Sequence, residues 1–391
     1  MPPNSIPLAK SILGVSPSKI RELANLAFEM DGVLHLYFGE SNAPTPPFIK
    51  DAAIAALQEG YTFYTHNAGQ PGLRQAIAEN YQELHSVHLD PSSEVVVTAS
   101  GVQALHVAIR CLLDPGDEAL ILSPAWPNAT SIVQMCSALP REIPLSLQGE
   151  LYMIDFTALQ KSLTPKTRLL IYTSPSNPLG WVASSSDQSK LLSFCRENSL
   201  WLLADEVYER LYYEGTVSPS ILRLCNRDDA VVVVHSFSKT YCMTGWRLGW
   251  LVAPKELASK TTEMNEFIIS HAPSMVQRAG EVALRNGEKR IQEMVEELRK
   301  NRDFCQQALR SMHGIILPRP MGAFYLFPKI HGLTDSFEFC RQLLLKKKVG
   351  IAPGVAFGAG GEGSIRICYA ADRSVLEPAM ERLYEFLENW R

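Results

Sequence analysis

The chain has 391 residues, 46% of them apolar, which is more than one compact domain usually needs, so we expect two lobes. Its 37 basic and 41 acidic side chains nearly balance, and no basic stripe points to nucleic acid or to a membrane surface. The eight cysteines are scattered without a metal-ligand spacing, as is typical of reduced thiols in a cytoplasmic protein, and the apolar runs are too short for a membrane span. Residues 1–20 carry no convincing signal peptide, because Pro7 and Pro17 break their apolar stretches.

Short apolar runs that end in polar or turn residues recur between residues 95 and 252. They predict buried strands at 95–98, 119–122, 168–172, 200–204, 231–234 and 248–252. Helical periodicity lies between several of them, at 101–113 and 186–198. Strands that alternate with helices predict an α/β fold with a large domain, in which helices cover both faces of a mainly parallel sheet.

The pattern changes beyond these strands. Residues 281–312 form one charged amphipathic stretch, which predicts a long linking helix. After Gly314, shorter strands and helices indicate a smaller α+β domain, and we expect the N-terminal forty residues to pack on it. The predicted boundaries are 45–285 for the large domain, and 1–44 with 286–391 for the small domain.

Lys239 is the residue on which the functional prediction depends. It comes shortly after the β-branched run 231–234, where open α/β sheets bind their ligands. Ser236 and Ser238 offer hydroxyls beside it, and Arg247 offers a guanidinium fork for a phosphate. A lysine flanked by phosphate-binding groups is the arrangement needed to hold pyridoxal 5'-phosphate as a Schiff base. A loop lysine at the surface is the ordinary alternative for an isolated lysine.

Asp205 ends the apolar run 200–204, where a carboxylate is costly to bury without a partner. A protonated pyridine nitrogen would be a suitable partner, and a helix N-cap is the alternative. Tyr208 lies three residues further on and would reach the phenolic oxygen of the same ring, or else serve only in packing.

Two more signals follow predicted strands. Ser100, Gly101 and Val102 open a helix, and backbone N–H groups at a helix N-terminus bind phosphate well, although turn chemistry alone explains a Ser-Gly pair. Trp126 is placed to stack on an aromatic cofactor ring, and a core position is its ordinary alternative.

Four other polar positions have weaker contexts. Asn177 would hydrogen-bond cofactor or substrate, or would simply form an Asn-Pro turn. Arg366 lies between apolar neighbours and would clamp an α-carboxylate, or would face solvent from a strand. His85 and His88 have helical spacing, for which a solvated face is expected rather than a metal site.

In this combination and order, the segments resemble the fold-type I, class I/II pyridoxal-phosphate aminotransferases of the aspartate aminotransferase superfamily. The resemblance runs from about Leu36 to the C-terminus. It is carried by residues 64–74, 174–180, 204–208, 236–239 with 245–249, and 365–369.

The resemblance implies a cofactor and the residues that hold it. Lys239 matches the Schiff-base lysine and proton shuttle, Asp205 the partner of the pyridine nitrogen, and Trp126 the ring-stacking position. Tyr208 and Asn177 match the pair on the phenolic oxygen. The phosphate cup is matched by Ser100, Gly101, Val102, Ser236, Ser238 and Arg247.

The resemblance also implies a homodimer with shared active sites and a carboxylate clamp. Tyr64 is similar to the tyrosine that crosses the dimer interface to the neighbour's phosphate. Arg366 matches the α-carboxylate clamp, and Gly39 matches a backbone donor to the same carboxylate.

Departures from the family pattern concern the side-chain pocket. Glu40 and His271 stand near its expected mouth, and no cationic residue matches a binder of a distal carboxylate. An acidic wall favours a neutral or basic substrate over a dicarboxylic one. The expected reaction is transamination of an L-amino acid. The alternatives are elimination, replacement or cyclisation of a hydroxylated basic amino acid such as hydroxyarginine, or a silent effector domain of a transcription factor, for which the N-terminal region is too short and not basic enough.

Overall fold

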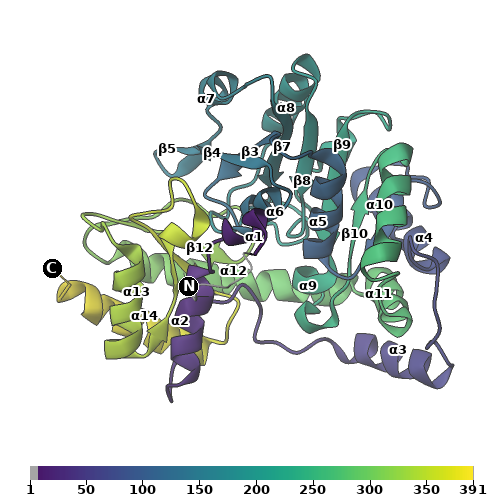
Figure 1. The fold of residues 1–391 in the computed structure, drawn as a ribbon. Coiled ribbons are helices and arrows are strands. Elements are labelled where there is room, and N and C mark those ends of the chain that lie inside the picture. Colours follow the sequence, from purple (N-terminus) through teal and green to yellow (C-terminus); the bar gives the residue numbers. More distant parts are fainter. Residues whose placement is uncertain (1–7, 391) are drawn as a thin grey trace, which may run out of the picture.

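The computed structural model describes residues 8–390 (Figure 1). Its centre is a seven-stranded sheet with the order β2-β10-β9-β8-β7-β3-β4. The strands are β2 (Val95–Thr98), β3 (Glu118–Ser123), β4 (Leu139–Pro144), β7 (Thr167–Thr173), β8 (Trp201–Asp205), β9 (Val231–Ser236) and β10 (Gly249–Val252). β10 runs antiparallel to β2 and β9, and the other neighbours are parallel. The predicted α/β fold with a mainly parallel sheet is confirmed.

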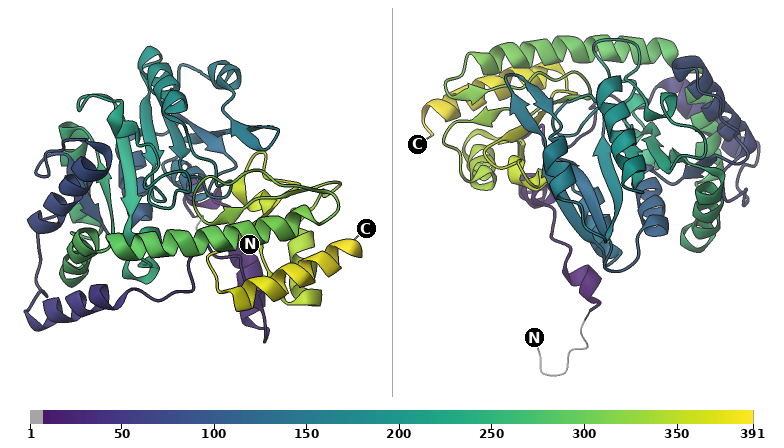
Figure 2. Two further views of the ribbon diagram at one scale, coloured as in Figure 1. Left: turned by 180° about the vertical axis from the view of Figure 1, so that it is seen from behind. Right: turned by 90° about the horizontal axis from the view of Figure 1, so that it is seen from above.

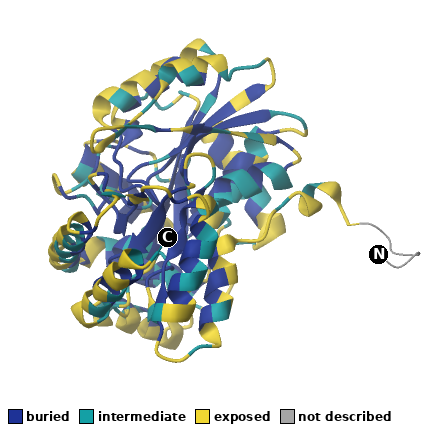
Figure 3. Cartoon of the chain, turned by 90° about the vertical axis from the view of Figure 1, so that its left-hand side faces the viewer, coloured by how far each residue is buried: buried dark blue, intermediate teal, exposed yellow. Residues whose placement is uncertain are grey.

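Helices cover both faces of this sheet because its central strands are apolar on both sides. Val232 and Val234 of β9 pack into one core, with residues of α5 (Gly101–Leu112), α6 (Asn128–Met135) and α10 (Lys255–Ile268). Val231 and Val233 pack into the other core, with residues of α4 (Pro71–His85), α8 (Ser185–Glu197) and α11 (Ser274–Asn286). The strands are accordingly dark in Figure 3, while the outer faces of the helices are exposed.

The C-terminal part has its own, smaller core. It contains α12 (Glu288–Arg310), α13 (Ser336–Lys347), α14 (Arg373–Glu388) and the antiparallel sheet of β12 (Tyr325–Leu326), β16 (Ile365–Cys368) and β15 (Ala352–Pro353). The N-terminal residues join it. β1 (Leu34–His35) pairs in parallel with β14 (Val349–Gly350), and α2 (Lys19–Phe28) packs nearby. The domain boundaries 45–285, 1–44 and 286–391 stay a prediction.

The predicted single helix at 281–312 is wrong. Residues 281–286 belong to α11, and the chain breaks at Gly287 before α12 begins. A side chain at position 287 would collide with the carbonyl oxygen of Ala283 and lie 2.9 Å from Cε1 of Tyr241. Beyond the break, α12 runs from beside the large sheet to the C-terminal part (Figure 2).

The remaining elements are short or peripheral. They are α1 (Lys10–Leu13), α3 (Pro47–Gln58), α7 (Phe156–Lys161), α9 (Phe237–Thr240), the pair β5 (Ser146–Gln148) and β6 (Leu151–Met153), and the pair β11 (Ile315–Ile316) and β13 (Lys329–Ile330). Among residues 8–390, no helix combines the length and apolarity needed to cross a bilayer.

Candidate functional site

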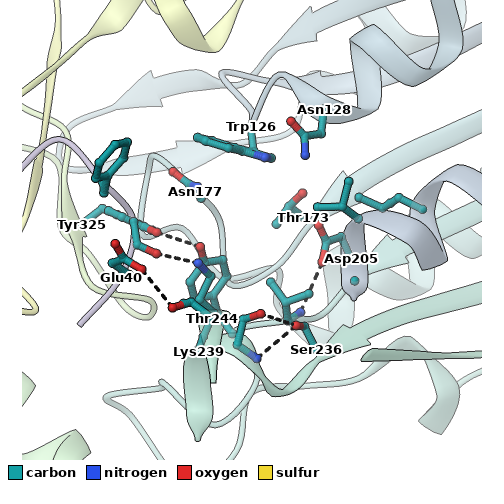
Figure 4. Close-up of a pocket in the computed structure, with 18 of the residues that line it drawn as sticks. Glu40, Trp126, Asn128, Thr173, Asn177, Asp205, Ser236, Lys239, Thr244 and Tyr325 are labelled. Atoms are coloured by element: carbon teal, nitrogen blue, oxygen red, sulfur yellow. Dashed lines mark hydrogen bonds between the residues drawn. The ribbon is translucent and has the colours of Figure 1, made fainter. Parts of the chain in front are cut away.

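A pocket of about 390 Å³ lies at the carboxyl ends of the parallel strands (Figure 4). The segments after β2, β3, β7, β8 and β9 all reach it, and the C-terminal part closes it with Tyr325. Its lining includes these predicted residues: Gly39, Glu40, Gly101, Val102, Trp126, Asn177, Asp205, Tyr208, Ser236, Ser238, Lys239 and Arg247. Residues spread over more than 200 positions of the chain thus meet at one edge of the sheet.

Lys239 lies on α9, the single helical turn that follows β9. Its Nζ donates a hydrogen bond of 2.5 Å to the carbonyl oxygen of Gly39. Burial lowers the pKa of Lys239 to about 8, and the nearby charges of Arg366 and Arg247 act in the same direction. The amine therefore loses its proton far more readily than an exposed lysine does. Gly39, predicted as a backbone donor to a carboxylate, here offers its carbonyl group to Lys239.

Asp205 is the last residue of β8, and a turn follows it, so the helix N-cap alternative is wrong. Its Oδ1 accepts one hydrogen bond of 3.3 Å, from the backbone N–H of Val207. Burial raises the pKa of Asp205 to about 6. A buried carboxyl with so little hydrogen bonding favours a cationic N–H partner. Tyr208 in the same turn bonds the hydroxyl of Tyr325 at 2.7 Å.

The predicted phosphate cup lies where α5 begins and β9 ends. The first two residues of α5 are Gly101 and Val102, and a Cβ on Gly101 would lie 3.1 Å from Cβ of Ser236, so these ends are closely packed. Ser236 Oγ lies 2.9 Å from Ser238 Oγ. Arg247 adopts a left-handed conformation (φ 55°) and donates to the carbonyl oxygen of Thr244 at 2.5 Å. Backbone N–H groups, hydroxyls and a guanidinium therefore meet at one end of the pocket, which suits a phosphate.

Ser100 does not line the pocket. Its hydroxyl caps α5 by accepting a hydrogen bond of 3.2 Å from the backbone N–H of Gln103. It is a buried residue with φ 121°, a strained conformation for serine, and it directs the chain from β2 into the helix.

Trp126 and Asn177 come from the segments after β3 and β7 and lie on the opposite side of the pocket from Lys239 in Figure 4. Arg366 of β16 lies behind the lining and is fully buried, so the solvent-facing alternative is wrong. Its Nη1 donates to Asn177 Oδ1 at 3.0 Å, its Nη2 donates to the carbonyl oxygen of Tyr37, and its Nε has no partner among residues 8–390. The guanidinium also packs 4.6 Å from the centre of the Tyr325 ring. A buried guanidinium with an unsatisfied N–H is suited to an anionic group.

The pocket mouth differs from the sequence-based prediction. Glu40 is present, and its Oε2 accepts a hydrogen bond of 2.9 Å from the Thr244 hydroxyl. The lining also contains Arg21 of α2, whose guanidinium lies 5.0 Å from the centre of the Phe38 ring. Within residues 8–390 this guanidinium makes no ion pair. No sequence motif marked Arg21 as a lining residue, and whether it binds a distal carboxylate of the substrate stays a prediction.

Tyr64 and His271 lie outside this pocket. The Tyr64 side chain is 90% exposed, and its ring meets that of His271 edge-on at 5.7 Å. His271 therefore does not line the side-chain pocket of its own chain. The role of Tyr64 in a neighbour's site stays a prediction.

Several lining residues were not predicted from the sequence, among them Arg21, Phe38, Asn128, Thr173, Thr244 and Tyr325. Asn128 and Thr173 follow predicted strands and Thr244 precedes one, while Arg21, Phe38 and Tyr325 lie far from any predicted strand. His85, expected on a solvated face, is instead buried. In the described part of the chain, no three His, Cys, Asp or Glu residues are grouped so as to hold a metal ion.

The pocket combines four chemical features within one cavity. Lys239, whose pKa is lowered, provides a nucleophile, and the buried carboxyl of Asp205 can pair with a cationic N–H. A cup of N–H and hydroxyl groups suits a phosphate, and Trp126 offers a flat apolar surface. These residues fit pyridoxal 5'-phosphate, which carries an aldehyde, a basic ring nitrogen and a phosphate on one aromatic ring.

Comparison with known proteins agrees with the geometry. The model of the family "Aminotransferase class I and II", whose enzymes use pyridoxal 5'-phosphate, matches residues 33–383. An aspartate aminotransferase of Pyrococcus horikoshii is 36% identical over 97% of both chains, and aromatic-amino-acid aminotransferase 2 of Thermococcus litoralis is 35% identical over 96% of both. A solved structure of a single mutant of Thermus thermophilus aspartate aminotransferase superposes with a TM-score of 0.91 at 31% identity, covering 98% of this chain and 100% of that one. The chain is therefore a member of the class I and II aminotransferases, and it is an enzyme.

Proposed function

We propose that this aminotransferase moves the amino group of an L-amino acid to a 2-oxo acid with the residues of the pocket at the carboxyl edge of the sheet. One observation carries the assignment. Lys239 and Asp205 come from the ends of neighbouring strands, β9 and β8, and line one cavity with the phosphate cup. Bound pyridoxal 5'-phosphate supplies an electron sink that stabilises negative charge on the substrate's α-carbon.

The residues of the pocket have separate roles in this proposal. Ser236, Ser238 and Arg247, with the N–H groups of Gly101 and Val102, bind the phosphate. Asp205 holds a proton on the ring nitrogen by opposing its charge. Trp126 covers one face of the ring. Tyr208 and Asn177 hold its phenolic oxygen by hydrogen bonds.

Lys239 would hold pyridoxal 5'-phosphate through Nζ, and with a substrate in the pocket the same Nζ would be the base that accepts the proton from the substrate's α-carbon. Its lowered pKa suits both tasks, because each needs the neutral amine near pH 8. Arg366, with an unsatisfied Nε beside Asn177, binds the substrate's α-carboxylate and so orients the α-carbon.

Reduction with borohydride tests the assignment of Lys239. The purified enzyme is loaded with cofactor, reduced and digested, and the peptides are mapped by mass spectrometry. The expected adduct is on Lys239 and is missing in Lys239→Ala. An adduct on another lysine, or none on the wild-type protein, would refute the proposal.

For the amino donor we propose a neutral or basic side chain, supported by Glu40 at the pocket mouth. One observation favours a second candidate, a dicarboxylic substrate: Arg21 lines the same mouth and makes no ion pair with any residue of 8–390, while Glu40 already bonds Thr244. The relatives named as aspartate aminotransferases agree with this second candidate. No observation in residues 8–390 favours elimination or cyclisation.

A substrate panel separates the two candidates. Aspartate, glutamate, aromatic amino acids, arginine and hydroxyarginine are each supplied with and without an oxo acid, and products are followed by mass spectrometry. Under the first candidate, Glu40→Gln lowers kcat/KM for arginine and Arg21→Gln does not. Under the second, Arg21→Gln lowers kcat/KM for aspartate and glutamate. Lys19→Gln is the control, because Lys19 lies on the same helix but outside the pocket.

We further infer that the enzyme is a homodimer, in which each active site is completed by residues of both chains, and that it works in the cytoplasm. The dimer is supported by the large apolar side chains of Phe63, Tyr64 and Phe267, which are 80%, 90% and 87% exposed in the single chain. The location is supported by the eight cysteines, none of which forms a disulfide.

A further inference from the structure

Three buried ionisable side chains lie behind the pocket without lining it. They are His85 at the end of α4, Glu209 in the turn after β8, and His235 on β9, and they are 5%, 2% and 1% exposed. Glu209 Oε2 lies 2.9 Å from Nε2 of His85, with which it forms a hydrogen bond. Its Oε1 lies 3.1 Å from Nε2 of His235, although that N–H is poorly aligned with the oxygen. One carboxylate thus joins two imidazoles from distant parts of the chain.

The hydrogen bonds on the far sides of the two rings define where their protons lie. His235 Nδ1 accepts from the backbone N–H of Ser236 at 2.9 Å, and His85 Nδ1 accepts from Arg223 Nε at 3.1 Å. A ring nitrogen that accepts carries no proton, so each imidazole holds its proton on Nε2, beside Glu209. Burial alone would raise the pKa of Glu209, but the two histidines outweigh it and hold that pKa well below its usual range. Glu209 is therefore an anion between two N–H groups.

Glu209 and His235 are each next in the chain to a residue that lines the proposed cofactor site. Glu209 directly follows Tyr208 in the turn that begins after Asp205. His235 directly precedes Ser236, whose Oγ accepts from the backbone N–H of Ser238 at 3.1 Å. The ring of His235 is also stacked on Trp250 at 4.2 Å, so it cannot turn freely. The position of the His235 ring thereby fixes the backbone N–H of Ser236 and the hydroxyl pair that follows.

We propose that Glu209 and His235 are positioning residues that hold Ser236 and Ser238 in the orientation that binds the cofactor's phosphate. The inference rests on the proposed function, in which this pocket takes pyridoxal 5'-phosphate. The residues touch neither substrate nor cofactor. They act through the backbone of Ser236, so their removal affects the phosphate end of the site in particular.

The test compares pyridoxal 5'-phosphate with pyridoxal, which lacks the phosphate. Full-length protein is freed of cofactor and titrated with each compound by fluorescence and absorbance, and the melting temperature of each variant is recorded. Glu209→Gln and His235→Ala are expected to weaken binding of pyridoxal 5'-phosphate about tenfold, the effect of one lost hydrogen bond to a charged group, and to leave binding of pyridoxal unchanged.

Two further variants provide the controls. Glu206→Gln alters a fully buried acid in the same turn, whose Oε1 accepts from the backbone N–H of Ile221 at 2.9 Å and which does not line the pocket. It should lower the melting temperature at most. His235→Asn keeps an acceptor near the place of Nδ1, so it should restore much of the affinity that His235→Ala loses.

The outcomes separate the two proposals. The positioning role is overturned if Glu209→Gln and His235→Ala weaken the binding of both compounds equally, or weaken the binding of neither. The proposed function stands in either case, provided that the wild-type protein binds pyridoxal 5'-phosphate. Wild-type protein that binds neither compound refutes the proposed function itself. If Glu209→Gln does not fold, the comparison of His235→Ala with His235→Asn decides the question.

Discussion

At the scale of single residues, the site is built from groups whose ordinary ionisation has been changed by burial. Asp205 and Lys239 lie in one cavity, and burial moves their pKa values toward each other, to about 6 and about 8. Both shifts oppose the charged form, so each group is less stable alone than it becomes with an oppositely charged or covalent partner. The pair is therefore adapted to a bound molecule rather than to the empty cavity.

The first prediction concerns Asp205→Asn in protein freed of cofactor. The folded-state pKa of about 6 exceeds the ordinary 3.8, so the charged carboxylate destabilises the fold above pH 6, and this effect disappears as pH falls below 3.8. The variant should gain on the order of 2–3 kcal/mol at pH 7 and nothing at pH 3.5. Urea denaturation at both pH values measures the difference. With cofactor and substrate supplied, the same variant should lose most of its turnover, and an equally active variant would contradict the role of Asp205.

The second prediction concerns the pH dependence of cofactor attachment. The neutral amine of Lys239 is the nucleophile, and its pKa is about 8, so the attachment rate should rise about tenfold per pH unit below pH 8 and level off above it. Stopped-flow absorbance from pH 6 to pH 10 measures the rate. A plateau reached only above pH 10 would mean that Lys239 behaves as an ordinary exposed lysine. Lys239→Ala should show no covalent phase at any pH.

At the scale of elements, the break between α11 and α12 determines the direction in which α12 runs away from the large sheet. α11 and α12 would form one continuous rod if the chain did not turn at Gly287, and the turn brings α12 toward the C-terminal part. Helical propensity alone favours alanine over glycine by about 1 kcal/mol. The tight packing against Ala283 and Tyr241 opposes that preference.

Gly287→Ala should therefore destabilise the protein by about 1–3 kcal/mol instead of stabilising it. The free energy of unfolding is measured by urea denaturation with cofactor in excess. Gly14→Ala serves as the matched control, because a Cβ at position 14 has no atom nearer than 3.8 Å. A gain in stability for Gly287→Ala would show that the contact with Tyr241 relaxes easily.

The sequence predicted elements well where the signal was local. The predicted bounds of β2 match those observed, because three consecutive valines and a threonine end in a turn, and the predicted β8 was displaced by one residue. The break at Gly287 was missed because the charged helical pattern continues on both sides of it. Arg21, Tyr325 and the burial of His85 could not be predicted, since each depends on a residue far away in the chain. Glu209, for example, lies 124 positions from His85.

At the scale of the whole molecule, the single chain presents apolar surface that no described residue covers. Phe63, Tyr64 and Phe267 are each at least 80% exposed, and Tyr64 carries a hydroxyl as well. Monomeric proteins seldom leave such large side chains in water, so a second copy of the chain is the expected partner.

The fourth prediction tests this arrangement. Sedimentation of the wild-type enzyme should show two chains, and Tyr64→Phe should weaken retention of the cofactor by about 1–2 kcal/mol without dissociating them. Dialysis of the holoenzyme followed by absorbance measures the loss. Tyr61→Phe is a suitable control, because Tyr61 is a nearby tyrosine that stacks on Arg278. A fully active monomer at low concentration would contradict the shared site.

β10, the single antiparallel strand of the seven-stranded sheet, has a consequence for the order in which that sheet can assemble during synthesis. β10 separates β2 from β9, although both precede it in the chain, and β2 pairs with no other strand of the sheet. As the ribosome releases the chain, β2 therefore has no partner strand in this sheet until residues 249–252 have been made. A nascent chain that stops short of these residues contains all the parallel strands of the large sheet, but its β2 is unpaired. The phosphate end of the site, which joins the segments after β2 and β9 on either side of β10, is thus expected to form only after residues 249–252 have entered the sheet.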